Sequence, residues 1–316
     1  MSRYKIRWVL THDPIALFEE AARRFQALVS EGSNGEIEVE VLTPTEYGGG
    51  TRVSAPEVMR QVVSGELQMS QTYTTVLGKL YDRLWALDLP YLFGSHEHAA
   101  RVLDGPLGRE LLDGLVPHDI RGLAFTYSGG YRIVSSTTKA IQSIDDLKGL
   151  HIRTAENPVV TALFESLGAH PHPAPLQAIP ALTQDGEVEA AESTWPRYWD
   201  LGHHRVQPVV NETSHSLFLT ALVVNESFYQ GLPKALQVVL RDAALETARH
   251  ERDKSVQDGL RSRAAYQAAG GVVHTMSSAE SQRFERAGRK IHAQFADRFG
   301  PQWLEEIAAE AFSAAG

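Results

Sequence analysis

The sequence contains no cysteine, and this excludes several classes of site at once. Thiolate zinc sites, iron–sulfur clusters and thiol nucleophiles all require a cysteine sulfur. No disulfide can form either, so cysteine pairing gives no indication of the compartment. Long apolar runs are also missing, because no stretch approaches the roughly 18–20 residues that span a bilayer.

Positive charge is in the minority. The chain has 30 Lys and Arg against 39 Asp and Glu, a formal net charge of −9. Binding to nucleic acid needs a basic patch that neutralises phosphates, so no nucleic-acid partner is expected. An anionic ligand would also be repelled by the overall charge, and any acid that binds must therefore be held by a local cationic site.

Catalytic signatures are missing as well. The sequence has no G-x-S-x-G elbow, no H-E-x-x-H, no Walker A motif and no dinucleotide fingerprint. The glycine run 48–50 lacks the second-glycine spacing and the Lys-Ser/Thr pair that would hold phosphates, so it is read as a turn. We therefore expect no enzyme activity and no cofactor.

Three groups of histidines were considered as metal ligands. His96 and His98 are two residues apart, so on a helix their imidazoles point to different faces, and a surface helix start is the expected role. The pairs 203–204 and 170/172 lack a cysteine or a suitably spaced carboxylate partner. No metal site is expected.

Apolar periodicity predicts alternating strands and helices. With 316 residues, 43% of them hydrophobic, the chain is long enough for two domains or one large α/β domain. The main expected helices are 15–29, 97–115, 159–167, 233–268 and 279–298, and the main expected strands are 5–10, 36–42, 122–127, 133–136, 150–154 and 217–224. Strand 217–224 is apolar throughout, which is typical of a strand in a parallel sheet covered on both faces.

The segment 233–268 is unusual for its length. Its apolar face is interrupted by the nearly all-polar stretch 249–254, which predicts one long helix that has a solvated middle and bridges two lobes. The alternative is two helices that break near Gly259.

Two arginines lie at the ends of expected strands. Arg153 closes the run 150–154, and Arg132 follows the flexible segment 128–131. In open α/β sheets ligands bind outside the carboxyl ends of strands. A guanidinium there offers a planar, permanently charged fork that binds a carboxylate bidentately. A surface salt bridge is the alternative for either residue.

Three blocks resemble the solute-binding subunit of tripartite ATP-independent periplasmic (TRAP) transporters, the DctP-type family. They read DLPYLFGSHEHAARVLDGPLGREL (88–111), IDDLKGLHIRTAENPVVTALFESLGAHPHP (144–173) and LVVNESFYQGLPKALQ (222–237). The blocks occur in the family's order, and the resemblance extends over essentially the whole chain.

The resemblance implies an α/β, bilobed periplasmic-binding-protein-like fold. Two mixed-sheet lobes are joined by hinge strands, and a long helix crosses both. Lobe I is expected to comprise residues 1–129 and 219–258, and lobe II residues 130–218 and 259–316.

It also implies a carboxylate-bearing ligand. The family's D-L-K-G-x-x-I-R motif places the ligand arginine at Arg153, and the G-[FY]-R segment adds Arg132. The loop V-D-G-x-E-N matches at Glu192 but has Ser193 where asparagine is common. Leu176 stands where many members carry a phenylalanine that packs on the ligand. These two departures bear on ligand identity.

Further ligand contacts are implied for His12, Tyr73 and Trp195. Tyr73 and Trp195 could form flat walls with a polar handle, and each could equally be a core aromatic. Glu192 would repel a carboxylate. It is therefore expected to accept a hydroxyl or an amine from the ligand, or to help hold a cation as in some family members.

The expected function is extracytoplasmic capture of a small organic acid and its delivery to a TRAP membrane permease. The resemblance implies a periplasmic location, and we expect a monomer. No secretory signal is visible between Met1 and the first strand, so a cytoplasmic protein and a mature form with an added start remain alternatives. A ligand-sensing module with a signalling partner and, less favoured, a cytoplasmic enzyme are the alternative functions.

Overall fold

A computed structural model describes residues 3–10 and 16–310, and its contacts divide the chain into two compact units. Unit 1 comprises Met1–Leu84, Ala100–Tyr127 and Leu219–Lys254, and unit 2 comprises Trp85–Ala99, Ser128–Phe218 and Ser255–Gly316. These units differ from the predicted lobes chiefly in Trp85–Ala99, which belong to unit 2. The lobes themselves concern motion, and they stay a prediction.

Unit 1 is built on a mixed sheet. Strand β1 (Tyr4–Val9) pairs in parallel with β2 (Ile37–Leu42) and β3 (Met69–Tyr73), and β3 pairs antiparallel with β9 (Leu217–Asn225). The first part of β4 (Ile120–Ser136) lies beside β9. The helices of this unit are α1 (Ala16–Gly32), α2 (Pro44–Tyr47), α3 (Ala55–Ser64), α4 (Thr74–Leu77), α6 (Pro106–Asp113), the 3-10 helix η2 (Val116–His118), α10 (Glu226–Gly231) and the first part of α11 (Lys234–Ala268).

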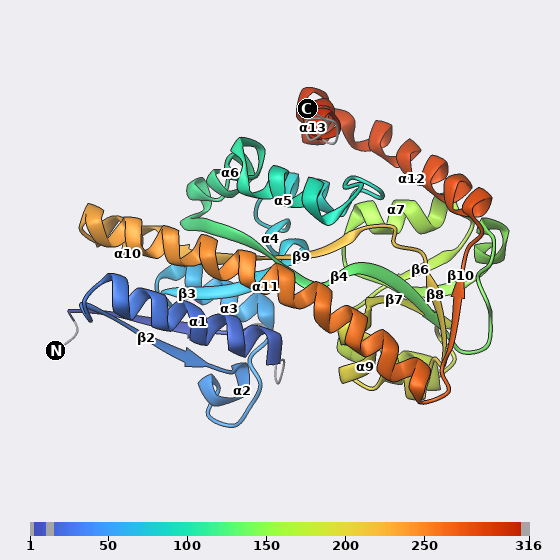
Figure 1. Ribbon diagram of the computed structural model, residues 1–316, viewed down its shortest axis with the longest axis horizontal. Helices are drawn as coiled ribbons and strands as arrows, with labels where there is room; N and C mark the ends of the chain where they lie inside the picture. Colours follow the sequence, from blue (N-terminus) through green and yellow to red (C-terminus); the bar gives the residue numbers. More distant parts are fainter. Residues whose placement is uncertain (1–2, 11–15, 311–316) are drawn as a thin grey trace. The chain divides into compact units, whose positions relative to one another are not determined.

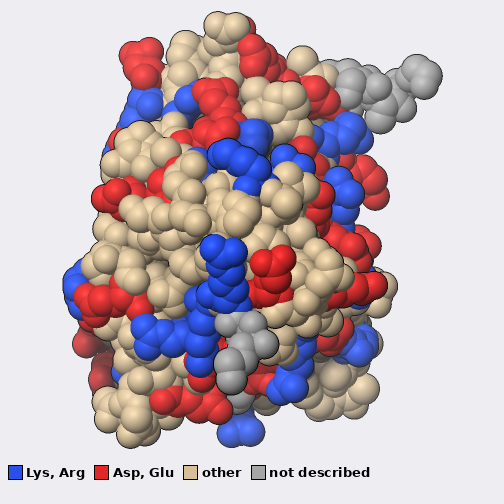
Figure 2. Space-filling view, turned by 90° about the vertical axis from the view of Figure 1, so that its left-hand side faces the viewer, with Lys and Arg blue, Asp and Glu red and all other residues tan. Residues whose placement is uncertain are grey.

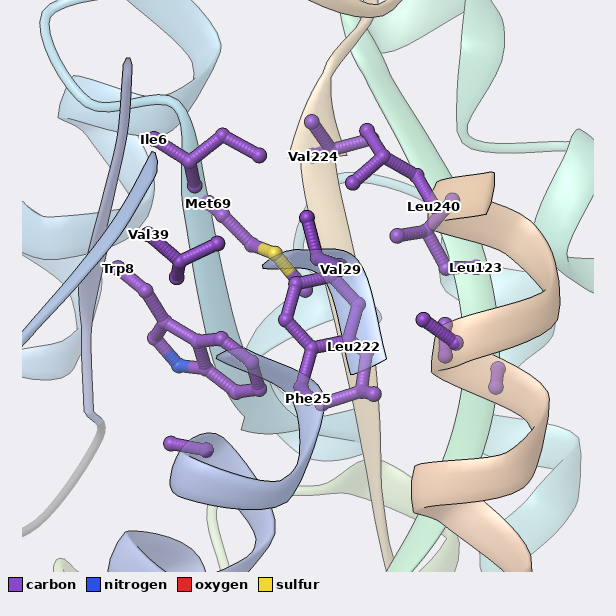
Figure 3. Packing of buried hydrophobic residues seen from close by; sticks show 14 of the residues in the cluster. Ile6, Trp8, Phe25, Val29, Val39, Met69, Leu123, Leu222, Val224 and Leu240 are labelled. Atoms are coloured by element: carbon purple, nitrogen blue, oxygen red, sulfur yellow. The ribbon is translucent and has the colours of Figure 1, made fainter. Parts of the chain in front are cut away.

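The core of unit 1 lies between its sheet and two helices (Figure 3). The apolar face predicted for the first helix is confirmed, since Phe25 and Val29 of α1 are fully buried. The Phe25 ring meets the Trp8 ring edge-on, with centroids 5.1 Å apart. Leu240 of α11 and Leu222 of β9 belong to the same cluster. The first part of α11 is therefore the second helix that covers this core.

Unit 2 holds the second mixed sheet. The end of β4 pairs antiparallel with β7 (Ala190–Thr194) and with β8 (Val209–Glu212). Strand β5 (His151–Thr154) pairs in parallel with β6 (His170–Pro173) and β7, and β10 (Val272–Thr275) pairs in parallel with β8. The helices are α7 (Pro158–Ser166), α8 (Ile179–Gln184), α9 (Trp195–Asp200), α12 (Ser278–Phe299), α13 (Pro301–Glu310), the end of α11 and the 3-10 helices η3 (Ile144–Leu147), η4 (Leu176–Ala178) and η5 (His203–Arg205). The 3-10 helix η1 (Asp82–Asp88) and α5 (His96–Asp104) have residues in both units.

Several predicted elements need correction. The helix 97–115 is two helices, α5 and α6, because Pro106 has no N–H to continue the first and Gly105 caps the second. The strands 122–127 and 133–136 are one strand, β4, which continues through two glycines. Strand 217–224 is fully buried as expected, but it pairs antiparallel with β3. Apolar composition reports burial and does not fix strand direction.

The long helix is confirmed as one element, and the alternative of a break near Gly259 is wrong (Figure 1). Its polar middle is solvated on one face only, where Arg249 and Asp253 are exposed. On the other face Glu251 and Arg252 are buried within unit 1, where Arg252 binds both oxygens of Asp104 at 2.8 Å and the carbonyl of Phe125 at 2.9 Å. The prediction of a solvated middle is therefore confirmed for one face and wrong for the other.

No helix in the part of the chain that the structure describes is both long and apolar enough to cross a membrane. On the face of the molecule shown in Figure 2, acidic and basic side chains are interspersed. The net negative charge is thus not gathered into one acidic area on that face, and local groups must decide whether an anion is attracted or repelled.

Two consecutive glycines in β4 adopt positive φ angles, +99° at Gly129 and +84° at Gly130. A Cβ atom on Gly129 would lie 2.3 Å from Thr194 Oγ1 and 2.9 Å from Pro196 Cδ, whereas on Gly130 it would meet only His96 Cε1 at 3.8 Å among the described atoms. Both positions require a backbone conformation that L side chains avoid, but only Gly129 is also in close contact with neighbouring atoms.

We therefore expect Gly130→Ala to lower the free energy of unfolding by about 1–2 kcal/mol through backbone strain alone. Gly129→Ala should cost about 3 kcal/mol or more, because overpacking adds to the same strain. Urea denaturation of the two variants and the wild type measures both values. Equal losses would show that the contact with Thr194 does not limit this position.

Candidate functional site

The sheet of unit 2 brings three of the predicted site residues together. Arg132 lies on β4, Glu192 on β7 and Arg153 on β5, and these strands are neighbours in the order β4-β7-β5. Arg132 pairs with Thr194 and Val134 with Glu192, so the Arg132 and Glu192 side chains are diagonal neighbours on one face. Arg153 pairs with Ala191, one residue before Glu192. Strand register therefore places the Arg132 guanidinium beside the Glu192 carboxylate, whereas Arg153 reaches the backbone carbonyl of Glu192.

Glu192 is fully buried, and both of its carboxylate oxygens are engaged by protein groups. Oε1 accepts a hydrogen bond from the Ala155 backbone N–H at 2.7 Å and lies 3.4 Å from Arg132 Nη1. Oε2 lies 3.2 Å from Nε2 of His215, which is also fully buried. In this arrangement Glu192 fixes the groups around it. Its predicted contact with a ligand hydroxyl, amine or cation stays a prediction.

Arg132 is shared between two buried carboxylates. Its Nη2 lies 3.4 Å from Asp88 Oδ1 and its Nη1 lies at the same distance from Glu192 Oε1. The guanidinium carbon also sits 3.9 Å from the centre of the Phe218 ring, a cation–π contact on one face of the fork. Arg132 Nε has no hydrogen-bond partner among the described residues. The sequence analysis identified neither Asp88 nor Phe218.

Asp88 and Asn157 form the outer part of the same cluster. Asn157 Nδ2 donates to Asp88 Oδ2 at 2.8 Å. Asn157 Oδ1 accepts from the Val159 N–H, which caps the first turn of α7. Sequence signals for both existed: Asn157 precedes Pro158 at a helix start, and Asp88 opens the first block of the family resemblance.

Arg153 is 3% exposed and is fixed by main-chain carbonyls. Its Nε donates to Ala174 O at 2.7 Å and its Nη1 donates to Glu192 O at 3.2 Å. These two contacts fix the plane of the guanidinium, and the two accepting carbonyl oxygens carry no formal charge. A carboxylate would meet a fork whose orientation is already set.

The two carboxyl groups around Arg132 have opposite pKa shifts. Burial raises the pKa of Asp88 to about 6, because Arg132 and Asn157 offset it incompletely and the Glu192 charge adds to it. Burial also opposes ionisation of Glu192, but Arg132, the His215 hydrogen bond and Arg153 outweigh it and lower the pKa to about 2. Burial lowers the pKa of His215 despite its contact with Glu192. Neutral His215 can therefore donate from Nε2 to Glu192, while its Nδ1 contacts Thr213 Oγ1 at 2.8 Å.

The other predicted site residues of unit 2 are buried nearby. Ser193 points to the opposite face of β7 from Glu192, and its Oγ has no hydrogen-bond partner in the described part of the chain. Leu176 is 6% exposed and begins η4. Trp195 packs against Tyr198 and Tyr266, and its Nε1 donates to Glu212 at 3.1 Å. This packing is that of a core aromatic, and the contact of Trp195 with a ligand stays a prediction.

Tyr73 belongs to unit 1, where it is the last residue of β3 and is 7% exposed. His12 lies outside the described residues. Their roles in ligand binding stay predictions.

The histidines have other roles in the fold. His98 was predicted at a surface helix start, yet it is 3% exposed, and its Nε2 contacts Ile307 O at 2.8 Å. Helix α13, which the sequence analysis did not predict, covers it. Among the described residues there is no group of three or more His, Asp or Glu side chains placed to hold a metal ion.

Comparison with known proteins gives one family. Residues 11–298 match the family model DctP, described as bacterial extracellular solute-binding protein, family 7. A solute-binding protein of Verminephrobacter eiseniae is 32% identical over 70% of this chain and 65% of its own length. The C4-dicarboxylate-binding protein DctB of Bacillus subtilis is 25% identical over 91% of this chain and 81% of its own.

Solved structures agree. A TRAP periplasmic solute-binding protein from a Bradyrhizobium species, in complex with D-galacturonate, is 28% identical and superimposes with a TM-score of 0.87. The alignment covers 96% of this chain and 99% of that one. The α/β fold with two mixed sheets is thereby confirmed.

The position of Glu192 leads to a prediction about stability. Because its pKa is lower in the folded protein, ionised Glu192 stabilises the fold above the ordinary glutamate pKa of about 4.5, and this contribution disappears as pH falls through the folded value. Glu192→Gln keeps the side-chain shape but removes the charge from between Arg132 and His215. We expect a loss of about 3–5 kcal/mol at pH 7, typical of breaking a buried ion pair.

Urea denaturation at pH 7 and pH 3 tests this, and the difference between variant and wild type should shrink at pH 3. Glu189→Gln is the matched control, since Glu189 is exposed three residues away. A Glu192 penalty that is unchanged at pH 3 would mean that the charge is not what stabilises the cluster.

Proposed function

The chain belongs to family 7 of the bacterial extracellular solute-binding proteins, and on that premise we propose that it captures a small organic acid whose carboxylate binds to Arg153. The observation that carries the proposal is the Arg153 guanidinium. It is buried at the end of β5, and two main-chain carbonyls fix its orientation. A cation in that setting is pre-organised for an anion.

The proposed class of ligand is based on the ligands named for two related proteins. The B. subtilis relative is named for C4-dicarboxylates and the Bradyrhizobium structure contains galacturonate. These ligands share a carboxylate and differ in the rest of the molecule. This supports a carboxylate at Arg153 and leaves specificity to the remaining surroundings, in which the buried Ser193 replaces the asparagine common in the family.

For capture, the bound ligand must stabilise one conformation of the protein over the others. We propose that residues 1–129 with 219–258, and residues 130–218 with 259–316, move as two lobes that close on the ligand. A ligand that contacts both lobes binds the closed state more tightly and shifts the population towards it. The glycines at 129 and 130, where β4 passes from one unit to the other, can absorb changes in backbone angles.

The biological setting follows the same premise. We propose a periplasmic, monomeric binding protein that delivers its ligand to a TRAP membrane permease and catalyses no reaction. Catalysis would need an activated nucleophile or a metal, and the buried polar groups of unit 2 are instead arranged as ion pairs and hydrogen bonds.

We expect Arg153→Ala to abolish most of the rise in melting temperature that a ligand causes, because ligand stabilisation scales with affinity for the folded state. The measurement is a thermal-shift series with D-galacturonate, D-glucuronate and succinate on wild type and variant. Arg153→Lys keeps the charge but lacks the fork, and it should retain a smaller shift than the wild type.

Arg286→Ala serves as a control, since Arg286 is exposed on α12 in the same unit. It should leave the ligand-induced shift intact. A full shift in Arg153→Ala with an acid that stabilises the wild type would refute the assignment of Arg153.

A further inference from the structure

Two buried carboxylates share one guanidinium in unit 2. Asp88 and Arg132 are each 1% exposed at the side chain and Glu192 is 0% exposed, and each carboxylate lies 3.4 Å from a different Arg132 nitrogen. When both acids are ionised, these three groups carry two negative charges and one positive charge. The charge of Arg153 also stabilises ionised Glu192, whereas Arg132 is the cation that acts on Asp88. The buried charge of Asp88 is therefore incompletely compensated, which is unfavourable, and one proton removes it.

Asp88 is the member best placed to take that proton. Glu192 is held ionised by Arg132, by His215 and by the Ala155 N–H, whereas among the described residues the Asp88 carboxylate accepts hydrogen bonds from Arg132 and the Asn157 amide. Each Asp88 oxygen accepts one hydrogen bond, Oδ2 from Asn157 Nδ2 at 2.8 Å and Oδ1 from Arg132 Nη2 at 3.4 Å, so Oδ1 is the more weakly held oxygen. The raised pKa of Asp88, about 6, agrees with this geometry.

We propose that Asp88 is a positioning residue for Arg132 and that binding of an organic acid is coupled to uptake of one proton from solvent by the Asp88 carboxylate. The inference rests on the proposed function, because it takes the ligand carboxylate to lie near the arginines. Protonation of Asp88 releases Arg132 from one of its two counter-ions. The guanidinium charge then becomes available to the incoming anion, and the anion in turn favours protonated Asp88.

The other charged and titratable groups around Asp88 do not replace it in this role. Arg132 on β4 and Arg153 on β5 keep their charge at all relevant pH values. Glu192 on β7 has a lowered pKa, and burial keeps the pKa of His215 below its ordinary value. His203 of η5 has a pKa lowered to about 4, chiefly by burial and then by Arg153.

The proposed coupling makes ligand affinity rise as pH falls. Above the pKa of free Asp88 the carboxylate is ionised, and the ligand must bind beside an extra negative charge. As pH falls through that pKa, the charge is removed and affinity rises. A coupling of up to one pKa unit corresponds to as much as about a tenfold change in affinity.

The test is calorimetric titration of the wild-type protein with D-galacturonate between pH 5.5 and 8. A carboxylate of this kind is ionised throughout the range, so its own titration does not contribute. We expect affinity to rise about three- to tenfold from pH 8 to pH 5.5. At pH 7 the binding enthalpy should differ between phosphate and Tris buffers, because their ionisation enthalpies differ when they supply the proton.

Asp88→Asn should bind with nearly constant affinity over this range and with the same enthalpy in both buffers. Asp200→Asn is the matched control: Asp200 is another acid of unit 2 whose pKa is raised by burial, and its loss should leave the pH dependence intact. Asn157→Ser keeps a capping oxygen for α7 but removes the amide donor that favours ionised Asp88, so it should move the pH profile upwards. This variant carries the test if Asp88→Asn fails to fold.

The outcomes separate the two proposals. Binding of D-galacturonate that is independent of pH and buffer would overturn the inference and leave the proposed function standing. If D-galacturonate fails to bind at any pH, the proposed function fails for this acid. The pKa of Asp88 is then measured in the ligand-free protein. Carbon-13 NMR of labelled aspartate should then show a resonance, absent in Asp88→Asn, that titrates near pH 6. A midpoint below pH 4 would overturn the inference.

Discussion

The contact between Glu192 and Arg132 is the one on which the rest of the site depends. The ionised Glu192 carboxylate is fully buried. A guanidinium, an imidazole and a backbone N–H surround it and offset the free-energy cost of burying its charge. Those partners come from separate segments of unit 2, so a single carboxylate fixes β4, the end of β5 and the segment before β9 relative to β7. The backbone carbonyl of the same residue also receives Arg153. Removing the charge would disturb both arginines at once.

The two arginines have the same chemistry in different surroundings. Arg132 lies between two acids and against an aromatic ring, so much of its charge is already used within the protein. Arg153 is oriented by carbonyl oxygens, which accept hydrogen bonds and bring only partial charge. The two carbonyl contacts fix the orientation of the Arg153 guanidinium before a ligand arrives. This contrast is the reason for proposing Arg153 as the anchor, although Arg132 is the more deeply buried of the two.

Periodicity in the sequence was enough to predict the elements that pack on one continuous apolar face, such as α1, and the length of α11. It could not predict strand direction, since β9 is apolar on both faces in an antiparallel pairing just as it would be in a parallel one. It also misread one face of the polar middle of α11. Arg252 looks solvent-exposed in a one-dimensional pattern because its partner Asp104 is distant in sequence, and only the fold brings the two together.

The site was predictable to the extent that a motif marks it. Arg153, Arg132 and Glu192 occupy motif positions, and the strand order β4-β7-β5 then makes them neighbours. Asp88 and His215 were missed for a physical reason: each acts through a residue that a motif does mark, and nothing in their local sequence reveals that partner. A lone aspartate before a leucine and a proline carries no chemistry until it meets Arg132. Its burial raises its pKa to about 6, so in the coupling proposed above a residue whose partner the local sequence does not reveal is the one that tunes the site.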